Sequence, residues 1–286
     1  MENILKFAVQ KSGRLQSDSL ALLKECGLKA SISGNVLKAK VENYPVELLY
    51  LRDDDIPGYV SNGVVDAGIV GENVVLEKES KVDVVEKLGF AKCRLSIAVP
   101  KSSDIRSIKD LDNKKIATSY PKILDNFLKE NNINSTLHEI SGSVELAPSI
   151  GLSDGICDLV SSGTTLFQNG LKEIQEVLSS EAVLISNRSL SKEKLSILEQ
   201  LLFRIRSVNQ ASSNKYIVLN VPNESLDAVV DLLPGMRSPS VTALKQEGWS
   251  SVHSLVKEND FWEVIEKLRE VGAEGILVLP VEKMIL

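Results

Sequence analysis

The chain has 286 residues, 43% of them hydrophobic and 25% charged, which is enough for about two domains, or three small ones, with sizeable cores. Its net charge of -6 and the lack of a Lys/Arg stripe argue against nucleic acid as the main partner. No apolar run approaches the roughly 20 residues of a membrane span. The N-terminus does not have the pattern of a signal peptide, so a cytoplasmic location is expected.

Cysteine and histidine usage gives no sign of a disulfide framework or a metal site. Cys26, Cys93 and Cys157 are isolated along the chain, and we expect them to be small core residues. His138 and His253 are far apart and lack the spacing of metal ligands. We therefore expect no metal cage built by the protein alone.

The first strand is expected at residues 5–9. It leads into Gln-Lys-Ser-Gly-Arg at 10–14 and then into a helix that ends at Gly27. Lys11 and Arg14 lie at the start of that helix, where positive charge favours the binding of a polyphosphate. The alternative is that both are solvent-exposed loop residues without a ligand. After a strand at 46–51, the acidic run at 53–55 predicts either a metal site or, more commonly, a helix N-cap.

Strands and helices continue to alternate up to about residue 210. Further strands are expected at 65–70, 82–85, 94–99, 115–119, 137–140 and 182–186, and helices at 123–131 and 191–212. This alternation predicts α/β architecture with parallel sheets, whose ligands bind at the carboxyl ends of the strands. A crossover near Pro100 and a return near residue 180 predict two lobes that face one cleft.

The most informative stretch covers residues 145–166. A buried strand at 156–160 carries Asp158 and ends in the hydroxyl-rich turn Ser-Ser-Gly-Thr-Thr at 161–165. Free amides at a helix start, together with hydroxyls, favour an anion, and a carboxylate on the strand would reach an attached sugar. The pattern predicts a site for a phosphorylated ribose; an ordinary strand, turn and Thr-capped helix is the alternative.

The remaining residues, 212–286, have a different pattern. We expect four strands, at 216–221, 240–244, 252–256 and 275–279. A short helix stopped by Pro234 and Gly235 follows the first strand. A second helix, with Asp260 as N-cap and Gly272 at its end, follows the third. The order βαββαβ predicts a ferredoxin-like domain. Such a domain suits ligand sensing, and plain oligomerisation is the alternative.

Several motifs occur in one order along nearly the whole chain. They are Gln-Lys-Ser-Gly-Arg-Leu at 10–15, Arg-Asp-Asp-Asp-Ile-Pro-Gly at 52–58, Asp-Ala-Gly-Ile-Val-Gly-Glu-Asn at 66–73, Arg-Leu-Ser at 94–96, Ile-Ala-Thr-Ser-Tyr-Pro at 116–121, the stretch at 145–166, and Leu-Pro-Gly, Phe-Trp and Ile-Leu-Val-Leu-Pro in the tail. In these motifs the chain resembles the long form of the ATP phosphoribosyltransferase family, which opens histidine biosynthesis.

The resemblance implies a fold of two α/β lobes like a periplasmic binding protein, followed by an ACT-like regulatory domain that binds histidine. Residues 1–100 and 182–211 would form the first lobe, 101–181 the second lobe with the phosphoribosyl pyrophosphate site, and 212–286 the regulatory domain. Dimers that assemble into hexamers are expected.

The resemblance also implies the reaction. N1 of the adenine of ATP attacks the anomeric carbon of phosphoribosyl pyrophosphate, giving phosphoribosyl-ATP and pyrophosphate, with Mg²⁺ required and L-histidine as feedback inhibitor. Because adenine N1 already carries a lone pair, no strong general base is needed. Mg²⁺ bound mainly through substrate phosphates needs few protein ligands.

Matched residue by residue, the family pattern assigns four groups. The expected catalytic residues are Asp158, Lys11 and Arg14. The phosphoribosyl pyrophosphate site would use Glu145, Asp154, Asp158, Ser161, Ser162, Gly163, Thr164 and Thr165. The ATP side would use Lys11, Arg14, Glu72, Arg94 and Tyr120, where Arg94 and Tyr120 are equally explained as structural. The histidine pocket is expected around Asn220, Ser240, Leu255 and Gly275.

Two other functions fit the same fold. A two-lobed solute-binding or sensing module would have an export signal or a DNA-binding helix pair, and the sequence shows neither. A non-catalytic subunit of a transferase complex is disfavoured by the intact Asp158 and hydroxyl-rich turn.

Overall fold

The computed structural model describes residues 3–30, 37–233, 235 and 238–285. The chain divides into two compact units, which are described separately. The first unit combines Met1–Lys24 with Leu28–Leu198, and the second combines Glu25–Gly27 with Glu199–Leu286. No helix in the described ranges is long and apolar enough to cross a membrane.

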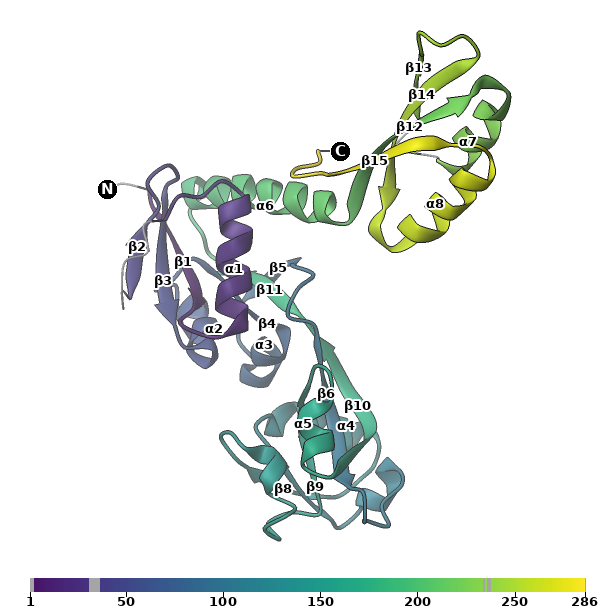
Figure 1. The fold of residues 1–286 in the computed structure, drawn as a ribbon. Coiled ribbons are helices and arrows are strands. Elements are labelled where there is room, and N and C mark those ends of the chain that lie inside the picture. The colour runs from purple at the N-terminus through teal and green to yellow at the C-terminus, as the bar shows by residue number, and fades with distance from the viewer. Residues whose placement is uncertain (1–2, 31–36, 234, 236–237, 286) are drawn as a thin grey trace. The chain divides into compact units, whose positions relative to one another are not determined.

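The first sheet of the first unit has the order β2-β3-β1-β4-β11-β5 (Figure 1). Its strands are β1 (Leu5–Gln10), β2 (Lys38–Lys40), β3 (Val46–Leu51), β4 (Ala67–Gly71), β5 (Asp83–Lys87) and β11 (Ala182–Ser186). Strand β1 is parallel to β3 and β4, but β11 is antiparallel to β4 and β5, so the expected all-parallel sheet is corrected to a mixed one.

Helices of the first sheet follow its strands directly. They are α1 (Arg14–Glu25), the 3-10 turn η1 (Asp53–Asp55), α2 (Ile56–Ser61) and α3 (Glu72–Lys78). Buried residues such as Ile56, Val70 and Val183 pack α2 and α3 against the strands. Asp55 of the acidic run occupies the N-cap position of α2, as expected, but it is in a helical conformation and its side chain makes no capping hydrogen bond.

The second sheet of this unit has the order β10-β6-β9-β7-β8. Its strands are β6 (Cys93–Pro100), β7 (Lys115–Thr118), β8 (Thr136–Glu139), β9 (Gly155–Val160) and β10 (Leu171–Ser180). Its helical elements are η2 (Ile108–Leu111), α4 (Pro121–Glu130), η3 (Val144–Leu146) and α5 (Thr164–Gln168). Because β7 and β9 are parallel neighbours, the turns after them lie at the same edge of the sheet.

The chain passes between these two sheets twice. The first passage is at residues 88–92, between β5 and β6, and the second is at Glu181, between β10 and β11. Strands β6 and β10 run antiparallel to each other, as Figure 1 shows. Pro100 lies at the far end of β6, so the first passage is earlier than the expected crossover, whereas the return is where it was expected. The lobe boundaries themselves stay a prediction.

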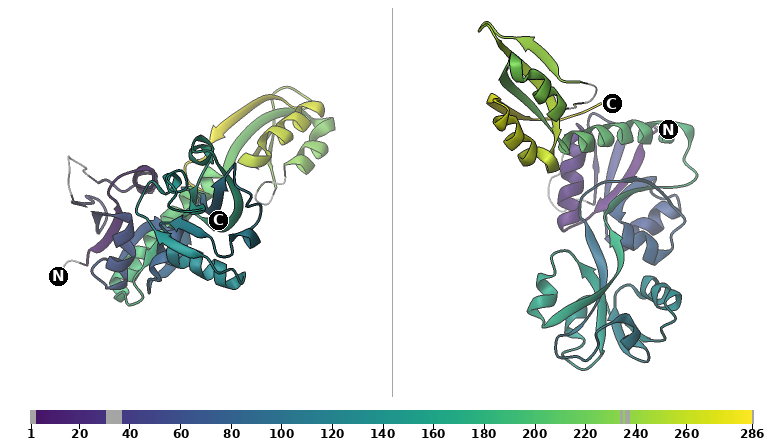
Figure 2. Two further views of the ribbon diagram at one scale, coloured as in Figure 1. Left: turned by 90° about the horizontal axis from the view of Figure 1, so that it is seen from below. Right: turned by 90° about the vertical axis from the view of Figure 1, so that its right-hand side faces the viewer.

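The second unit contains the third sheet, with the order β13-β14-β12-β15 and antiparallel pairing throughout. Helix α6 (Lys192–Ser212) precedes β12 (Asn214–Pro222), η4 (Asn223–Ser225), α7 (Leu226–Leu232), β13 (Ser240–Ala243), β14 (Trp249–Lys257), η5 (Glu258–Asp260), α8 (Phe261–Glu270) and β15 (Glu274–Pro280). This order confirms the predicted βαββαβ domain, which two further views show (Figure 2).

Burial alternates along the two central strands of the third sheet, β12 and β14, because one face carries α7 and α8. Ile217, Leu219 and Val252 are buried on that face, while Tyr216 and Leu277 are exposed on the other. Asp260 occupies the expected N-cap position of α8, but its side chain makes no capping hydrogen bond. Gly272 follows α8 with φ +93°, as a helix end requires. Pro234, expected to stop α7, lies outside the described residues.

Candidate active site

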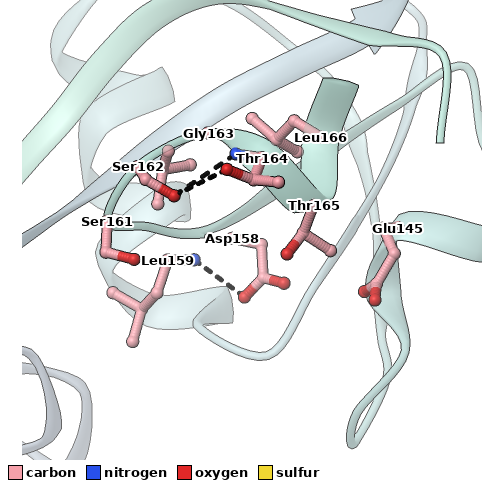
Figure 3. Close-up of a pocket in the computed structure, with 10 residues that line it drawn as sticks. Glu145, Asp158, Leu159, Ser161, Ser162, Gly163, Thr164, Thr165 and Leu166 are labelled. Atoms are coloured by element: carbon pink, nitrogen blue, oxygen red, sulfur yellow. Dashed lines mark hydrogen bonds between the residues drawn. The ribbon is translucent and has the colours of Figure 1, made fainter. Parts of the chain in front are cut away.

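The hydroxyl-rich turn, residues 161–165, forms a pocket between β9 and α5. The pocket has a volume of about 180 Å³ and is lined by Glu145 and by residues 158–166 (Figure 3). Gly163 takes φ +77°, a conformation that strains residues with a side chain, and so allows the chain to turn back into α5. The hydroxyls of Ser162 and Thr164 lie 3.0 Å apart on the turn. The pocket surface is therefore rich in hydroxyl and amide donors.

Asp158 supplies the negative charge at the base of this pocket. It sits near the carboxyl end of β9, paired with Ser96 of β6, and its Oδ1 accepts the Leu159 N–H at 2.8 Å. Burial raises the pKa of Asp158, and the negative charge of Glu145 raises it further. Two carboxylates that repel each other across one pocket suit a ligand with hydroxyl donors or a cation.

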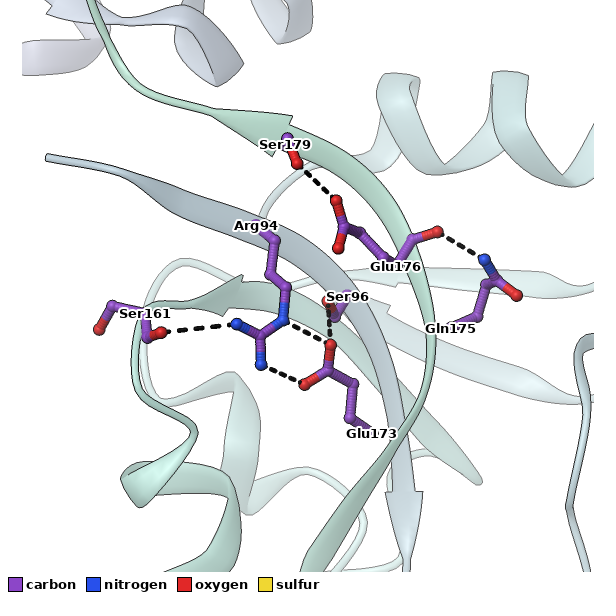
Figure 4. A network of polar contacts seen from close by, with 7 residues as sticks. All are labelled: Arg94, Ser96, Ser161, Glu173, Gln175, Glu176 and Ser179. Carbon is purple, nitrogen blue, oxygen red and sulfur yellow. Dashed lines mark hydrogen bonds and ion pairs between the residues drawn. The ribbon is translucent and has the colours of Figure 1, made fainter. Parts of the chain in front are cut away.

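A hydrogen-bonded network holds the turn from the β6 side (Figure 4). Arg94 binds Glu173 of β10 through two bonds, Nε to Oε1 at 2.6 Å and Nη2 to Oε2 at 2.7 Å. Ser96 donates to the same Oε1 at 2.8 Å. The third guanidinium nitrogen, Nη1, lies 3.5 Å from the Ser161 carbonyl oxygen. Arg94 thereby links β6, β10 and the turn, and its expected contact with ATP is not carried into the proposal below.

Tyr120 lies at the same sheet edge as the turn, because it follows β7. Its hydroxyl accepts a hydrogen bond from Asn73 Nδ2 at 3.2 Å. Burial raises the pKa of Tyr120, and the negative charges of Asp158 and Asp53 add to this effect. The charge of Asp158 thus acts on Tyr120, and the role of Tyr120 toward ATP stays a prediction.

The other expected ATP residues lie on the first sheet. Lys11 and Arg14 are exposed in the turn from β1 into α1, and neither forms an ion pair with any residue that the structure describes. Gly13 between them takes φ +94°. Glu72, at the start of α3, is paired with Lys87 at 2.9 Å. The two cations are thus available to an anionic ligand, while Glu72 already has a partner.

Asp154 is separated from the pocket. It precedes β9, and its Oδ2 accepts the Lys115 N–H at 2.8 Å. Four residues of extended strand separate it from Asp158, a distance of about 13 Å. The pocket lining includes Glu145 but not Asp154, so the predicted ribose role of Asp154 is not carried further either.

The expected histidine residues fall into two groups on the third sheet. The side chain of Asn220 in β12 lies against Gly275 in β15, where an added Cβ would be 3.2 Å from Asn220 Nδ2. Ser240 pairs with His253, two residues from Leu255 on β14. Their role in binding an inhibitor stays a prediction.

Sequence reasoning did not single out Glu173 or Glu77, and it considered Asp53 only as part of the acidic run at 53–55. Asp53 has a buried Oδ1 without a partner among the described residues, and burial, helped by Asp54, raises its pKa to about 6. Glu173 carries the Arg94 network, and Glu77 is a buried charged residue of α3. Of these last two, Glu77 had a visible signal, as a carboxylate within the apolar pattern of a short helix.

Comparison with known proteins identifies the family. The sequence profile of ATP phosphoribosyltransferase matches residues 52–207, and that of the HisG C-terminal domain matches residues 211–283. A curated ATP phosphoribosyltransferase of Cytophaga hutchinsonii is 56% identical over 285 residues, which is 100% of each chain. The chain belongs to the ATP phosphoribosyltransferase family.

Further relatives agree with this assignment. The ATP phosphoribosyltransferase of Phocaeicola vulgatus is 52% identical over 99% of this chain and 100% of its own. Among solved structures, an ATP phosphoribosyl transferase (HisG:HisZ) complex from Thermotoga maritima matches with a TM-score of 0.60 and 29% identity, over 71% of this chain and 99% of that chain. The match to the C-terminal domain makes this a long-form ATP phosphoribosyltransferase, the enzyme of the first step of histidine biosynthesis.

A second structural likeness concerns the fold alone. A periplasmic sulfonate-binding protein from Methylobacillus flagellatus matches with a TM-score of 0.51 at 17% identity, over 73% of this chain and 69% of that chain. It supports the predicted likeness of the two α/β sheets of this transferase to periplasmic binding proteins.

Proposed function

We propose that the pocket at residues 158–166 binds the 5-phosphate and ribose of phosphoribosyl pyrophosphate. The hydroxyls and amides of Ser161, Ser162, Gly163, Thr164 and Thr165 hold the phosphate, with the turn kept in place by the Arg94 network. Asp158 and Glu145 accept hydrogen bonds from the ribose hydroxyls. The observation that carries this assignment is the half-buried Asp158 carboxylate at the base of a hydroxyl-lined pocket.

Phosphoribosyl transfer forms a bond between adenine N1 and the anomeric carbon, and breaks the bond from that carbon to the pyrophosphate oxygen. The sugar becomes oxocarbenium-like in the transition state, while the electron pair of the broken bond leaves with pyrophosphate. A fixed carboxylate next to the sugar therefore stabilises the transition state more than the ground state. Asp158 is placed to do this, because its pocket already holds its charge partly out of water.

ATP binding is assigned to residues at the strand ends of both α/β sheets. The exposed cations Lys11 and Arg14 neutralise phosphates, and Tyr120 lies near Asp158 on the nucleotide side. Glu72 is a weaker candidate because of its ion pair with Lys87.

The described residues include no group of three or more His, Cys, Asp or Glu side chains arranged for a metal. The pair of carboxylates in the pocket, Asp158 and Glu145, nevertheless fits Mg²⁺ that is held largely by substrate oxygens. When bound, Mg²⁺ would supply positive charge to the leaving pyrophosphate.

Regulation and assembly are assigned to the third sheet. We propose that L-histidine binds there, near Asn220 and Gly275 or near Ser240 and Leu255, and that the chain forms dimers that assemble into hexamers. The uncovered face of this sheet carries the exposed apolar side chains Tyr216, Leu277 and Leu279, which supports assembly through this domain. The cytoplasmic location stays part of this proposal.

A single assay tests the catalytic assignment. The purified chain is mixed with ATP, phosphoribosyl pyrophosphate, Mg²⁺ and a pyrophosphatase, and phosphoribosyl-ATP is followed by its ultraviolet absorbance. Asp158→Asn is expected to lower kcat by about 100-fold or more, the scale of one lost transition-state interaction. Asp154→Asn, the matched control outside the pocket, should stay within about threefold of wild type. Full activity of Asp158→Asn would refute the assignment, and ligand binding without product in the wild type would favour a binding module.

A further inference from the structure

Helix α3, which follows a strand of the first sheet, contacts the start of α4, which follows a strand of the second. The contact is made by Glu77, whose Oε1 accepts the Lys122 N–H at 3.0 Å and whose Oε2 accepts the Ile123 N–H at 3.1 Å. Glu77 is only 8% exposed. A buried carboxylate with both oxygens used on backbone donors forms a specific, charge-assisted contact.

Helix α4 has no cap from its own sequence. Tyr120 occupies its N-cap position without a side-chain hydrogen bond, and Pro121 brings no N–H. The next two N–H groups, which the helix itself leaves unpaired, are those that Glu77 accepts. The negative charge also lies at the positive end of the helix dipole. The start of α4 is therefore completed by a residue from the other sheet.

Two neighbours of Glu77 add contacts to the same segment. Glu79 pairs with Lys122 Nζ at 2.7 Å, but both of these side chains are largely exposed, so this pair contributes little. Asn73, at the other end of α3, donates to the Tyr120 hydroxyl at 3.2 Å. Residues 120–123 are thus held from α3, and Glu77 makes the buried part of that contact.

The two ends of α3 make different contacts: the Glu72 N–H donates to the Glu181 carbonyl of the second chain passage at 3.0 Å, whereas Glu77, near the other end, reaches α4. Residues 88–92 and Glu181 alone would act as a pair of strands about which the two sheets can rotate. A further contact away from them fixes the angle. The angle matters because Lys11 and Arg14 lie on the first sheet, whereas the pocket at 158–166 lies on the second.

We infer that Glu77 is a positioning residue for phosphoribosyl transfer: by holding Tyr120 and the start of α4, it fixes the distance between nucleotide groups on the first sheet and the ribose pocket on the second. This inference rests on the proposed function. Glu77 is not among the residues that line the pocket at 158–166, so its effect is exerted through α4 and Tyr120.

The test is Glu77→Gln, which keeps the size of the side chain and one acceptor oxygen. In the variant the amide NH2, which is a donor, would face one of the two helix N–H groups, so one acceptor is lost together with the negative charge. We expect the KM for ATP to rise about tenfold and kcat to fall about tenfold, the scale of one charge-assisted hydrogen bond. The Kd for phosphoribosyl pyrophosphate, measured by calorimetry, should change less than twofold because none of its pocket residues contacts Glu77.

Glu79→Gln is the matched control on the same helix, since it removes the exposed partner of Lys122. It should leave KM and kcat within about twofold of wild type, as for most exposed ion pairs. Thermal unfolding and far-UV circular dichroism show whether each variant is folded at the assay temperature. If Glu77→Gln does not fold, Glu77→Asp, which keeps the charge on a shorter side chain, is measured instead. The same result is expected: changes in kcat and in the KM for ATP, with the Kd for phosphoribosyl pyrophosphate nearly unchanged.

Two outcomes would overturn the inference. One is a folded Glu77 variant with wild-type kcat and KM for ATP. The other is a loss of phosphoribosyl pyrophosphate affinity as large as the change in KM for ATP, which indicates a general structural role. Failure of the proposed function would give a different result. Either the wild-type chain would form no phosphoribosyl-ATP, or the Asp158→Asn variant would keep full activity.

Discussion

Carboxylates near the strand ends are the residues whose behaviour depends most on their surroundings. Asp158 and Asp53 both have raised pKa values, chiefly because burial disfavours their charged forms. Asp154, only four residues before Asp158, also accepts a backbone N–H but is exposed. Identical side chains thus differ in their surroundings according to burial and to the strand end at which they lie.

Asp53 gives a pH-dependent prediction. Its pKa is raised from 3.8 to about 6, so its ionisation destabilises the folded chain progressively between these two values and in full above pH 6. The effect is absent only well below pH 4, where both folded and unfolded chains hold the proton. We expect Asp53→Asn to raise the free energy of unfolding at pH 7.5 by about 1–2 kcal/mol, after allowance for solvent screening.

Thermal unfolding of wild type and Asp53→Asn at several pH values between 4 and 7.5 checks this prediction. The difference in Tm should grow between pH 4 and 6 and level off above pH 6. A variant that is less stable than wild type at every pH would show that the ionised carboxylate has a stabilising partner.

At the scale of elements, the turn between β9 and α5 depends on strands that are distant in sequence. Arg94 of β6 donates to the Ser161 carbonyl and is itself held by Glu173 of β10. The Arg94 hydrogen bond lowers the pKa of Glu173, so the pair stays charged at neutral pH. Strand β10 was not predicted because its Lys, Glu and Gln residues resemble a polar connection. Its pairing with β6 is what places Glu173 beneath the turn.

We predict that Arg94→Lys weakens phosphoribosyl pyrophosphate binding about tenfold, because lysine keeps the charge but cannot bind Glu173 with two nitrogens and reach Ser161 with a third. Calorimetry measures the Kd. Arg188→Lys is the control, since its pair with Asp83 is exposed and lies on the first sheet. Equal Kd values for wild type and Arg94→Lys would mean that the turn holds its shape without the network.

The whole molecule combines a transferase core with a C-terminal domain of a different fold. The third sheet has its own buried core, including Ile217, Val229 and Leu268. A domain with a separate core is suited to sense a ligand and to act on the catalytic part through a change of conformation or assembly.

We therefore predict that deleting residues 212–286 leaves phosphoribosyl-ATP formation measurable but abolishes inhibition by L-histidine. Initial rates with and without L-histidine, for the full and the shortened chain, give the answer, and size-exclusion chromatography with light scattering shows the accompanying change of assembly. Inhibition that survives the deletion would place the histidine site elsewhere. Circular dichroism confirms that the shortened chain is folded before rates are compared.

The sequence by itself determined the strand–turn–helix units, the βαββαβ tail and the composition of the pocket. Each of these is local: strand periodicity, glycine turns and the run at 161–165 are properties of neighbouring residues. The family resemblance, later confirmed by the profile matches, rests on the same ordered local motifs.

Tertiary structure alone decided which strands pair and in which direction. It therefore also decided which distant residues contact the local motifs. The antiparallel β11, the β10 edge, the Arg94–Glu173 pair and the contact from Glu77 to α4 join residues between 45 and 119 positions apart. The physical reason is that hydrophobic burial and backbone pairing select partners by the shape of the folded core. Neither hydrophobic burial nor backbone pairing leaves a pattern in the sequence that shows which distant residue a given side chain will contact.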